Sequence, residues 1–508
     1  MKKISKILAL IMGFLSTCSI FVSCAETGSS EPLLVPDYSE STKEFNIWSY
    51  HATCNGWYQY RDENGILRRH DRSETDPVPI SNAETIQEYK DCGFNILFIS
   101  YSHQFDGRDF ENSDAKKLMD IAYEKGLKCF VHEQVTSVLS RSDTSLIQPG
   151  SADGVTTFES QQALNTYIAD VIKDVIKHPA FYGFSLRDEP SYKQIDAIAE
   201  VYKAIQASAP GCFVNMNLFP MPSKGSNVFY PGGAQMTAEA AYTKYLEKMA
   251  TATGAPYIRY DDYPIDGTTE NPYIDGMHLS GLKLTAEFCK EKGLTFGKAF
   301  QSCELTTKAQ TIMLRKPTKR DMYWQMNLGM AFGVKDYSYW TYYPVINTSG
   351  EFYDETSTFL TRYGEKNDMW YWMSEMHPQM QATAKALMNF EYQGVQLYNN
   401  GKLPGSSIYA ENFSSTDTFK RLKNCTVNGD GSLLITELYD QGAGFYGYFI
   451  VNASDPVCDT TLSGTIDFGS FGYAQTYTNG EVENKTIKKG KYSYSLDTGE
   501  GVFVIPYK

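Results

Sequence analysis

The sequence of 508 residues lacks the motifs by which many enzymes bind metals, nucleotides or dinucleotides. It contains no HExxH, HxH, Walker or glycine-rich dinucleotide motif, and its 10 cysteines include no CxxC pair. Basic residues are also scarce, since 46 Lys and Arg face 60 Asp and Glu, for a net charge of −14. This balance argues against nucleic acid or an acidic membrane surface as a partner. We therefore expect chemistry that uses side chains alone, with no metal and no organic cofactor.

The N-terminus has the pattern of an export signal. A positive start, "MKK", precedes the apolar run "ILALIMGFLSTCSIFV", which is too short and wrongly flanked for a spanning helix. The run ends in "FVSC", which resembles the bacterial lipobox and implies lipidation of Cys24. An ordinary cleaved secretion signal is the alternative. We predict a signal peptide over residues 1–23, a flexible tether over 24–43, and an exported lipoprotein that meets the membrane only through its lipid.

Short apolar segments alternate with amphipathic helical segments from residue 44 onward. Eight segments have strand character: 44–52, 94–102, 127–135, 181–190, 212–220, 256–265, 294–304 and 335–344. The connections before these segments are short, whereas most of those after them are long and rich in Gly, Pro, Ser, Asp and Thr. This asymmetry is typical of a (β/α)8 TIM barrel. A doubly wound sheet is the rival fold, but no glycine-rich phosphate loop supports it.

The pattern changes after residue 388. Alternating runs such as "SLLITELYD", "FYGYFIVNAS" and "GVFVIPY" are separated by Gly, Asn and Asp turns. These runs predict a small antiparallel β-sandwich over residues 389–508. The α/β barrel is accordingly predicted to span residues 44–388.

The fourth predicted strand, "FYGFSLRDEP", ends on two acids and a proline. In a barrel this places Asp188 and Glu189 at the carboxyl end, on rigid backbone, and we expect Pro190 to begin the next helix. The alternative is that the acids merely cap that helix. A second acid, Glu304, closes the seventh strand segment across the barrel mouth. Cleavage of a glycosidic bond needs such a pair, one group to protonate the leaving oxygen and one to attack or stabilise the anomeric carbon.

These features together resemble the clan A glycoside hydrolases, which are TIM-barrel retaining enzymes. The residues that carry the resemblance are the "DEP" after strand four, the acid after strand seven, and "MNLGMAFGVKDYSYWTYYP" leading into strand eight. The resemblance covers about residues 44–390, and it implies that Glu189 is the acid/base and Glu304 the nucleophile. Asp188 stands where the clan has an Asn that holds the sugar 2-hydroxyl. Related "DEP" barrels end strand seven with a Gln segment, so Gln301 is an alternative counterpart.

Further polar residues at strand ends are candidates for hydrogen bonds to sugar hydroxyls. They are Tyr50, His51, Tyr101, His103, His132, Glu133, Asn217, Asp262 and Tyr263. Glu133 is also the reserve carboxylate. Because strand neighbours face opposite sides, only one of Asp261 and Asp262 can point into the barrel. Trp340 is the candidate for stacking on a sugar ring.

The sequence therefore predicts an exported glycoside hydrolase that cleaves poly- or oligosaccharides by a retaining two-carboxylate mechanism. Two other functions remain open at this point. One is a non-catalytic glycan-binding lipoprotein on a degenerate hydrolase barrel. The other is an exported hydrolase or lyase that acts on a different ester or sugar acid.

Overall fold

A computed structural model describes residues 35–54, 57–61, 67–71, 80–101, 109–148, 157–268, 270–306, 312–344, 352–353, 357–400, 413 and 417–508. The predicted signal peptide, the lipidation site Cys24 and the candidate His103 lie outside these ranges. No helix within them is both long and apolar enough to cross a bilayer.

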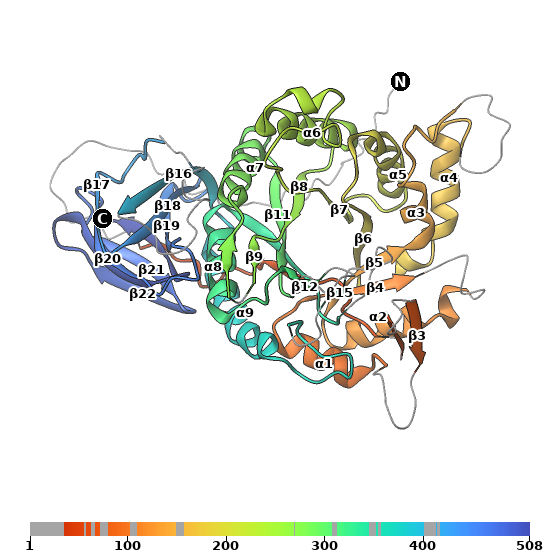
Figure 1. Ribbon diagram of the computed structural model, residues 1–508, viewed down its shortest axis with the longest axis horizontal. Coiled ribbons are helices and arrows are strands. Elements are labelled where there is room, and N and C mark those ends of the chain that lie inside the picture. Colours follow the sequence, from red (N-terminus) through yellow and green to blue (C-terminus); the bar gives the residue numbers. More distant parts are fainter. Residues whose placement is uncertain are drawn as a thin grey trace, which may run out of the picture. The chain divides into compact units, whose positions relative to one another are not determined.

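Eight parallel strands form a closed ring, seen end-on in Figure 1. They are β1 (Asn46–Ser49), β4 (Ile96–Tyr101), β5 (Lys128–Glu133), β6 (Phe181–Asp188), β7 (Phe213–Asn217), β8 (Tyr257–Asp262), β11 (Thr295–Gln301) and β14 (Val334–Trp340). Their order is β4-β5-β6-β7 in one sheet and β8-β11-β14-β1 in the other. The bridge Leu218↔Tyr260 joins β7 to β8, and the Asn95 N–H donates to the Ile47 carbonyl beside β1 and β4 (3.0 Å). The ring confirms the predicted (β/α)8 barrel.

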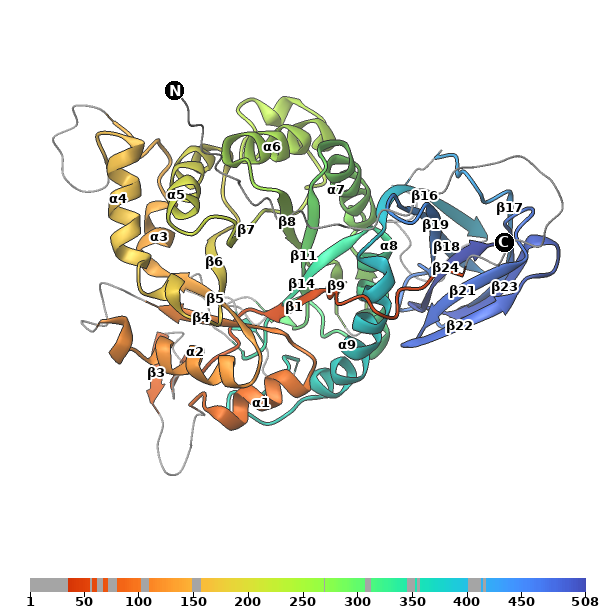
Figure 2. The same cartoon turned by 180° about the vertical axis from the view of Figure 1, so that it is seen from behind.

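Helices follow the strands and surround the ring, with β1 lying beside β14 in the reverse view of Figure 2. They are α1 (Ala83–Asp91), α2 (Asp114–Glu124), α3 (Gln134–Leu139), α4 (Gln161–Ile172), α5 (Ile195–Ser208), α6 (Ala238–Thr253), α7 (His278–Lys292), α8 (Lys319–Ala331) and α9 (Asp368–Leu387). Short 3-10 turns lie at Phe110–Asn112, Val175–Lys177, Tyr192–Gln194, Gly233–Gln235 and Lys488–Gly490. Polar N-caps such as Asn82 and Thr318 hold the first backbone amides of their helices.

Aromatic side chains fill the inside of the ring. Trp48 of β1 stacks on Phe98 of β4 (ring centroids 6.0 Å apart) and meets Phe130 of β5 edge-on (5.0 Å). Phe130 in turn packs against Phe213 of β7 (5.2 Å). Since these rings come from separate strands and meet each other, they define the inner face of each strand. Neighbouring residues in sequence must then face the helices.

The long loops after strands build further β-structure at the carboxyl end of the barrel. A five-stranded antiparallel sheet joins β9 (Ile265–Gly267), β10 (Pro272–Ile274), β12 (Leu305–Thr306), β13 (Ile312–Leu314) and β15 (Phe352–Tyr353). The loop after β1 holds the hairpin of β2 (Trp57–Arg61) and β3 (Leu67–Asp71). The carboxyl end of the barrel is thus lined by segments that follow β1, β8, β11 and β14.

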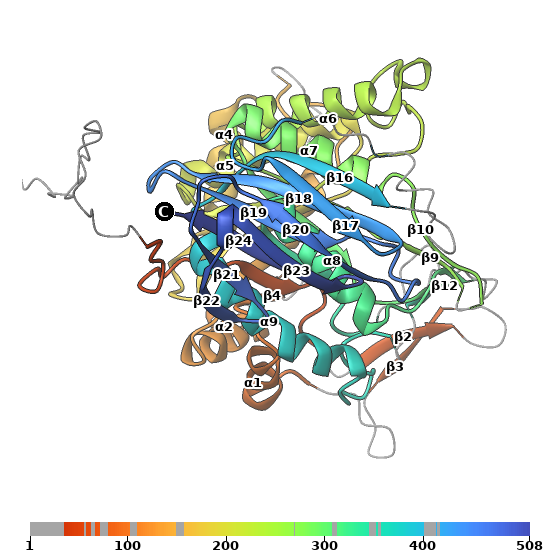
Figure 3. The same cartoon turned by 90° about the vertical axis from the view of Figure 1, so that its left-hand side faces the viewer.

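The C-terminal region forms two antiparallel sheets, shown in Figure 3. The larger runs β16 (Glu391–Asn400), β18 (Gly431–Asp440), β19 (Phe445–Asn452), β24 (Gly501–Tyr507), β21 (Tyr473–Thr478) and β22 (Glu481–Thr486). The smaller runs β17 (Asn424–Asn428), β20 (Thr461–Asp467) and β23 (Lys491–Asp497). One apolar core unites residues of both sheets, including Ile435, Ile450, Leu462 and Leu496. This is the predicted β-sandwich.

The sandwich contacts the barrel and the segment before β1. Asn327 of α8 donates from Nδ2 to the Gly499 carbonyl (2.8 Å). Tyr38 donates its hydroxyl to Asp440 (2.8 Å), and Gln475 donates to the Pro36 carbonyl (2.7 Å). Residues 35–43 were predicted to be part of a flexible tether. Pro36 and Tyr38 of this stretch instead contact folded structure, and Tyr38 also packs on the Phe390 ring.

Candidate active site

Asp188 and Glu189 lie at the carboxyl end of β6, as predicted, and the backbone holds both firmly. The Glu189 N–H donates to the Asn217 carbonyl of β7 (2.8 Å). Its φ of 43° is in the left-handed region, which costs a non-glycine residue on the order of 1 kcal/mol. Asp188 accepts a hydrogen bond from Asn217 Nδ2 (2.9 Å). The strained turn therefore aims two acids from consecutive positions at one end of the barrel.

Pro190 does not begin the next helix, contrary to the prediction. The chain first makes the 3-10 turn Tyr192–Gln194, and α5 begins at Ile195. Pro190 instead accepts a hydrogen bond from Tyr245 of α6 through its carbonyl. The acids are consequently no helix caps, since Ser191 supplies the capping box of that turn.

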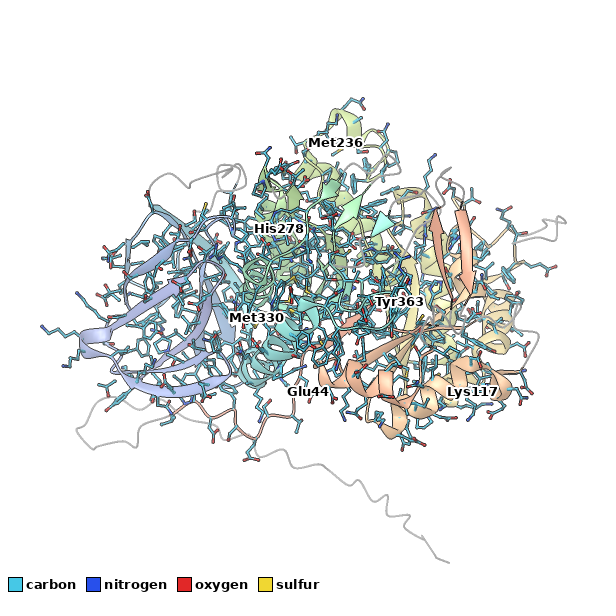
Figure 4. The ribbon with its side chains drawn as sticks, turned by 60° about the horizontal axis from the view of Figure 1, so that its bottom comes forward. Glu44, Lys117, Met236, His278, Met330 and Tyr363 are labelled. Carbon is cyan, nitrogen blue, oxygen red and sulfur yellow. The ribbon has the colours of Figure 1, made fainter. Side chains whose placement is uncertain are left out.

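Asp261 and Asp262 end β8 and face opposite sides of the strand. Asp262 pairs with His278 of α7, so its side chain lies between the barrel and the helices, and His278 is labelled in Figure 4. The prediction that Asp262 binds substrate is therefore wrong, because strand alternation turns it outward. Asp261 takes the inner position, where its Oδ2 accepts a hydrogen bond from Tyr263 (3.3 Å).

The acids of the inner face influence one another. Burial raises the pKa of the Asp261 carboxyl well above its usual value, and the negative charges of Glu189 and Asp188 raise it further. Burial also raises the pKa of Asp188, against the lowering effect of the Asn217 hydrogen bond. Protein atoms surround most of the Asp188 carboxyl group, but one side of the residue remains exposed to solvent. Three carboxyl groups thus meet at one end of the barrel.

Polar groups from other strands lie beside these acids. Asn215 of β7 donates from Nδ2 to the Tyr50 hydroxyl (3.1 Å) and to Ser185 (3.2 Å). His132 contacts the Ser185 carbonyl through Nδ1 (3.1 Å). Burial lowers the pKa of His51 to about 4, with a further lowering by His132, and burial likewise lowers the pKa of His132. Both imidazoles are therefore neutral hydrogen-bonding groups at neutral pH.

Trp340 at the end of β14 is half-buried and lies beside this polar group. Its ring centroid is 5.3 Å from that of Tyr50 and 5.1 Å from that of His51. The Trp340 carbonyl accepts hydrogen bonds from the Ser302 N–H (3.1 Å) and the Cys303 thiol (3.3 Å). The aromatic surface predicted for a sugar ring is accordingly at the end of the barrel that holds the acids.

Glu304 lies in the segment between β11 and β12, three residues beyond Gln301, where β11 ends. Its side chain is half-buried, and its N–H donates to the Ser357 hydroxyl (2.7 Å). Ser302 and Cys303, bonded to Trp340, connect it to the same end of the barrel. Its role as the second reacting carboxylate stays a prediction.

Three other predicted binding residues have structural roles. Gln301 is buried and bonds both the N–H and the carbonyl of Ile265 (2.9 and 3.0 Å), so it braces the loop after β8. Glu133 caps α3, because its carboxylate accepts from the Val135 and Thr136 amides (3.0 and 2.7 Å). Tyr101 packs edge-on against Phe110 (5.6 Å), on the face opposite to Phe98. These three predictions are wrong for reasons of capping, bracing and strand alternation.

Asp261 and Asn215 also belong to the inner group, although the sequence analysis selected their neighbours Asp262 and Asn217 as binding candidates. Alternation along β8 limits the choice to one of two aspartates, and only the partner His278, in a later helix, decides between them. Asn215 shares its face with Asn217, two positions along β7, and this periodicity is visible in "FVNMN".

No family model matches the sequence, and no curated protein matches it either. Solved structures do align with it. A GH30 endoxylanase from Clostridium papyrosolvens is 13% identical over 92% of this chain and 98% of its own, with a TM-score of 0.41. A family 39 glycoside hydrolase from Bacteroides cellulosilyticus is 11% identical over 89% and 88%, with a TM-score of 0.41. A family 5 glycoside hydrolase from Bacteroides vulgatus is 10% identical over 84% and 85%, with a TM-score of 0.44. Likeness at this level assigns neither a family nor an activity.

Proposed function

We propose that this protein is a glycoside hydrolase that cleaves O-glycosidic bonds in poly- or oligosaccharides. The observation that carries the proposal is the meeting of Asp188, Glu189 and Asp261 at the carboxyl end of the barrel. Burial raises the pKa of Asp261, and the negative charges of Glu189 and Asp188 raise it further. Glycoside cleavage requires a proton donor, and neighbouring carboxyl groups that raise one another's pKa can retain such a proton.

The surroundings of the acids suit a sugar. Trp340 offers a half-buried ring, while Tyr50, His51 and His132 offer neutral polar atoms. Sugars present apolar ring faces and many hydroxyls, so this mixture of ring and neutral hydrogen-bonding groups matches their chemistry. None of these groups needs a metal or an organic cofactor to bind a hydroxyl.

In the proposed mechanism Glu189 donates a proton to the glycosidic oxygen as its bond to the anomeric carbon breaks. Glu304 attacks that carbon and forms a glycosyl ester, with the bonding electron pair leaving on the oxygen. Glu189 then takes a proton from water, which attacks the ester and releases the sugar with its original anomeric configuration. Asp188, bonded to Asn217, is the group that we place beside the sugar 2-hydroxyl.

The substitution Glu189→Gln tests this function. Wild-type protein is screened against a panel of polysaccharides with reducing-end detection, and the variant is then assayed on each glycan that is cleaved. We expect a loss of about 10²–10⁴-fold in kcat, the usual contribution of a general acid. Glu239→Gln, an exposed glutamate of α6, is the matched control and should retain full activity. Unchanged activity in Glu189→Gln, or binding of a glycan without cleavage by the wild type, refutes the proposal.

We also propose that the protein is an exported lipoprotein, anchored at the cell surface through Cys24. The support is the N-terminal sequence alone. Metabolic labelling with a fatty-acid analogue should mark the wild type, and Cys24→Ala should abolish the label. Absence of label in the wild type leaves only the cleaved secretion signal.

A further inference from the structure

Asp188, Asn217 and Asp261 form a row across three neighbouring strands. Asp188 pairs with Asn217 in the register of β6 and β7, and Asn217 Nδ2 donates to Asp188. The Asp261 N–H donates to the Leu218 carbonyl (3.1 Å), so β8 lies directly beside the end of β7. Since neighbouring strands are about 4.8 Å apart, only the width of β7 separates the two aspartates along the sheet.

Two oxygens of this row are buried and unpartnered. Asp261 Oδ1 and Asn217 Oδ1 have no hydrogen-bond partner among the described residues, and their side chains belong to residues only 4% and 1% exposed. A buried acceptor without a donor costs on the order of 1–3 kcal/mol. A proton on Asp261 removes part of this cost, because a carboxylic acid is a donor as well as an acceptor. The two unpartnered oxygens therefore favour the protonated form of the Asp261 carboxyl group.

The charged and titratable groups around Asp261 are unbalanced toward negative charge. They are Asp188 and Glu189 from the end of β6, Arg259, Tyr260, Asp262 and Tyr263 from its own segment, Lys298 from β11, Tyr50 from β1, and Tyr242 and Tyr245 from α6. Arg259 is paired with Asp336, and Lys298 donates to the Asp262 carbonyl (2.9 Å) on the outer face. No cation among the described residues forms an ion pair with Asp261 itself.

We propose that Asp261 is a positioning residue, which keeps one proton within the cluster of Asp188, Glu189 and Asp261 and so maintains Glu189 as a proton donor. This role rests on the proposed glycosidase function. Two adjacent carboxyl groups titrate as a pair and release their last proton at a higher pH than one group alone. Asp261 forms and breaks no bond to the substrate. The proton leaves Glu189 for the glycosidic oxygen, and Asp261 extends the pH range in which that proton is present.

The pH dependence of kcat/KM in Asp261→Asn tests this role. Without the second carboxyl, the alkaline limb should move to lower pH by about one unit, a roughly tenfold loss that is confined to the alkaline side. KM at the acidic side should stay within about twofold, since Asp261 contributes no uniform binding. A merely structural defect lowers activity at every pH and leaves the limb in place.

Asp262→Asn is the matched control, because it makes the same chemical change at the next residue on the opposite face of β8. Its alkaline limb should stay close to that of the wild type, measured at a temperature at which circular dichroism shows this less stable variant to be folded. An unmoved limb in Asp261→Asn, or an equal shift in both variants, overturns the proposal.

A second measurement needs neither activity nor the Asp261 variant. Wild type and Glu189→Gln are compared in their free energy of unfolding across pH 4–9, a window chosen to span about the range of a raised carboxyl pKa. The destabilisation that accompanies ionisation of Asp261 should begin at higher pH in the wild type, where Glu189 opposes it. If the two proteins give superimposable curves of unfolding free energy against pH, the proposal that the cluster shares a proton is wrong. Shifted curves from a protein that cleaves no glycan uphold the shared proton and refute the proposed function alone.

Discussion

The two faces of β8 hold neighbouring aspartates with opposite electrostatic properties. Asp261 and Asp262 are both buried, at 4% and 8% exposure. Burial raises the pKa of Asp261 well above its usual value, and Glu189 and Asp188 add to the rise. Burial also acts to raise the pKa of Asp262, but His278 and Lys298 more than offset it and the net pKa is lowered. Burial is common to both, so the sign of the nearest charges decides the outcome.

The outer face is built for stability. Asp262 bonds His278, whose ring stacks on Trp324 of α8 (5.1 Å), and Lys298 lies over the Phe300 ring (4.4 Å). Burial lowers the pKa of His278, against the raising effect of the Asp262 charge that its Nδ1 contacts. On the inner face like charges meet and raise the pKa of Asp261, and carboxyl groups perturbed in this way are common at sites that act on a ligand. The comparison predicts that changes on the outer face cost stability and changes on the inner face cost activity.

The largest effect on stability should come from Asp262→Asn. Removing the anion takes away the His278 partner and the nearby negative charge that favours the buried Lys298 ammonium, and we expect a loss of about 3–5 kcal/mol in the free energy of unfolding at neutral pH. A depressed carboxyl pKa stabilises the fold above the unfolded-state pKa, and this contribution disappears as pH falls. The difference from wild type should therefore shrink below about pH 4. Denaturant unfolding at neutral and acidic pH measures both values, and a loss no greater than in Asp261→Asn contradicts the comparison.

Lys298→Met sharpens the comparison through its pH dependence. Burial lowers the pKa of Lys298 to about 8 from an ordinary 10.5. Between these values the unfolded chain binds more protons than the folded one, so wild-type stability gains from this group as pH rises. The wild type should therefore gain on the variant by up to about 3 kcal/mol from pH 8 to pH 10.5. Unfolding of both proteins over this range provides the test, and parallel curves refute the assignment.

The smallest effect on stability should come from Asp261→Asn. A raised carboxyl pKa means that the folded state loses stability as pH rises through the window above the ordinary value of 3.8. Asn cannot ionise, so the variant should equal or exceed the wild type by about 1 kcal/mol at neutral pH, with no such gain at pH 4. The midpoints of urea unfolding at the two pH values decide the matter, and a large loss at neutral pH contradicts it.

The sequence was sufficient for the architecture, because each of the eight strand segments became a barrel strand. Apolar runs between helical segments and unequal loop lengths are properties of the local chain, and they determine a parallel barrel with few alternatives. The same reading placed Asp188, Glu189 and Trp340 correctly at strand ends. The sequence also showed that only one of Asp261 and Asp262 can point into the barrel, although it did not show which one.

Side-chain direction and local hydrogen bonds could not be predicted from the sequence. Tyr101 faces Phe110 because it lies three positions after the inward-facing Phe98, and strand alternation places it on the opposite face. Glu133 caps a short helix, α3, which begins inside the segment 127–135 that was predicted as a strand. Gln301 bonds Ile265 in a loop that only the folded chain brings near. Only the Gln301 error depends on residues far apart in the sequence; the other two depend on side-chain direction and on a local helix cap.

The configuration of the first sugar released tests the central claim most directly. Wild-type protein is incubated with the glycan that it cleaves, and proton NMR follows the newly formed reducing end before mutarotation mixes its anomers. Two carboxyl groups acting by way of a glycosyl ester predict that the product first appears with the anomeric configuration of the substrate. First appearance of the opposite anomer contradicts the mechanism, and absence of any product from every glycan contradicts the function.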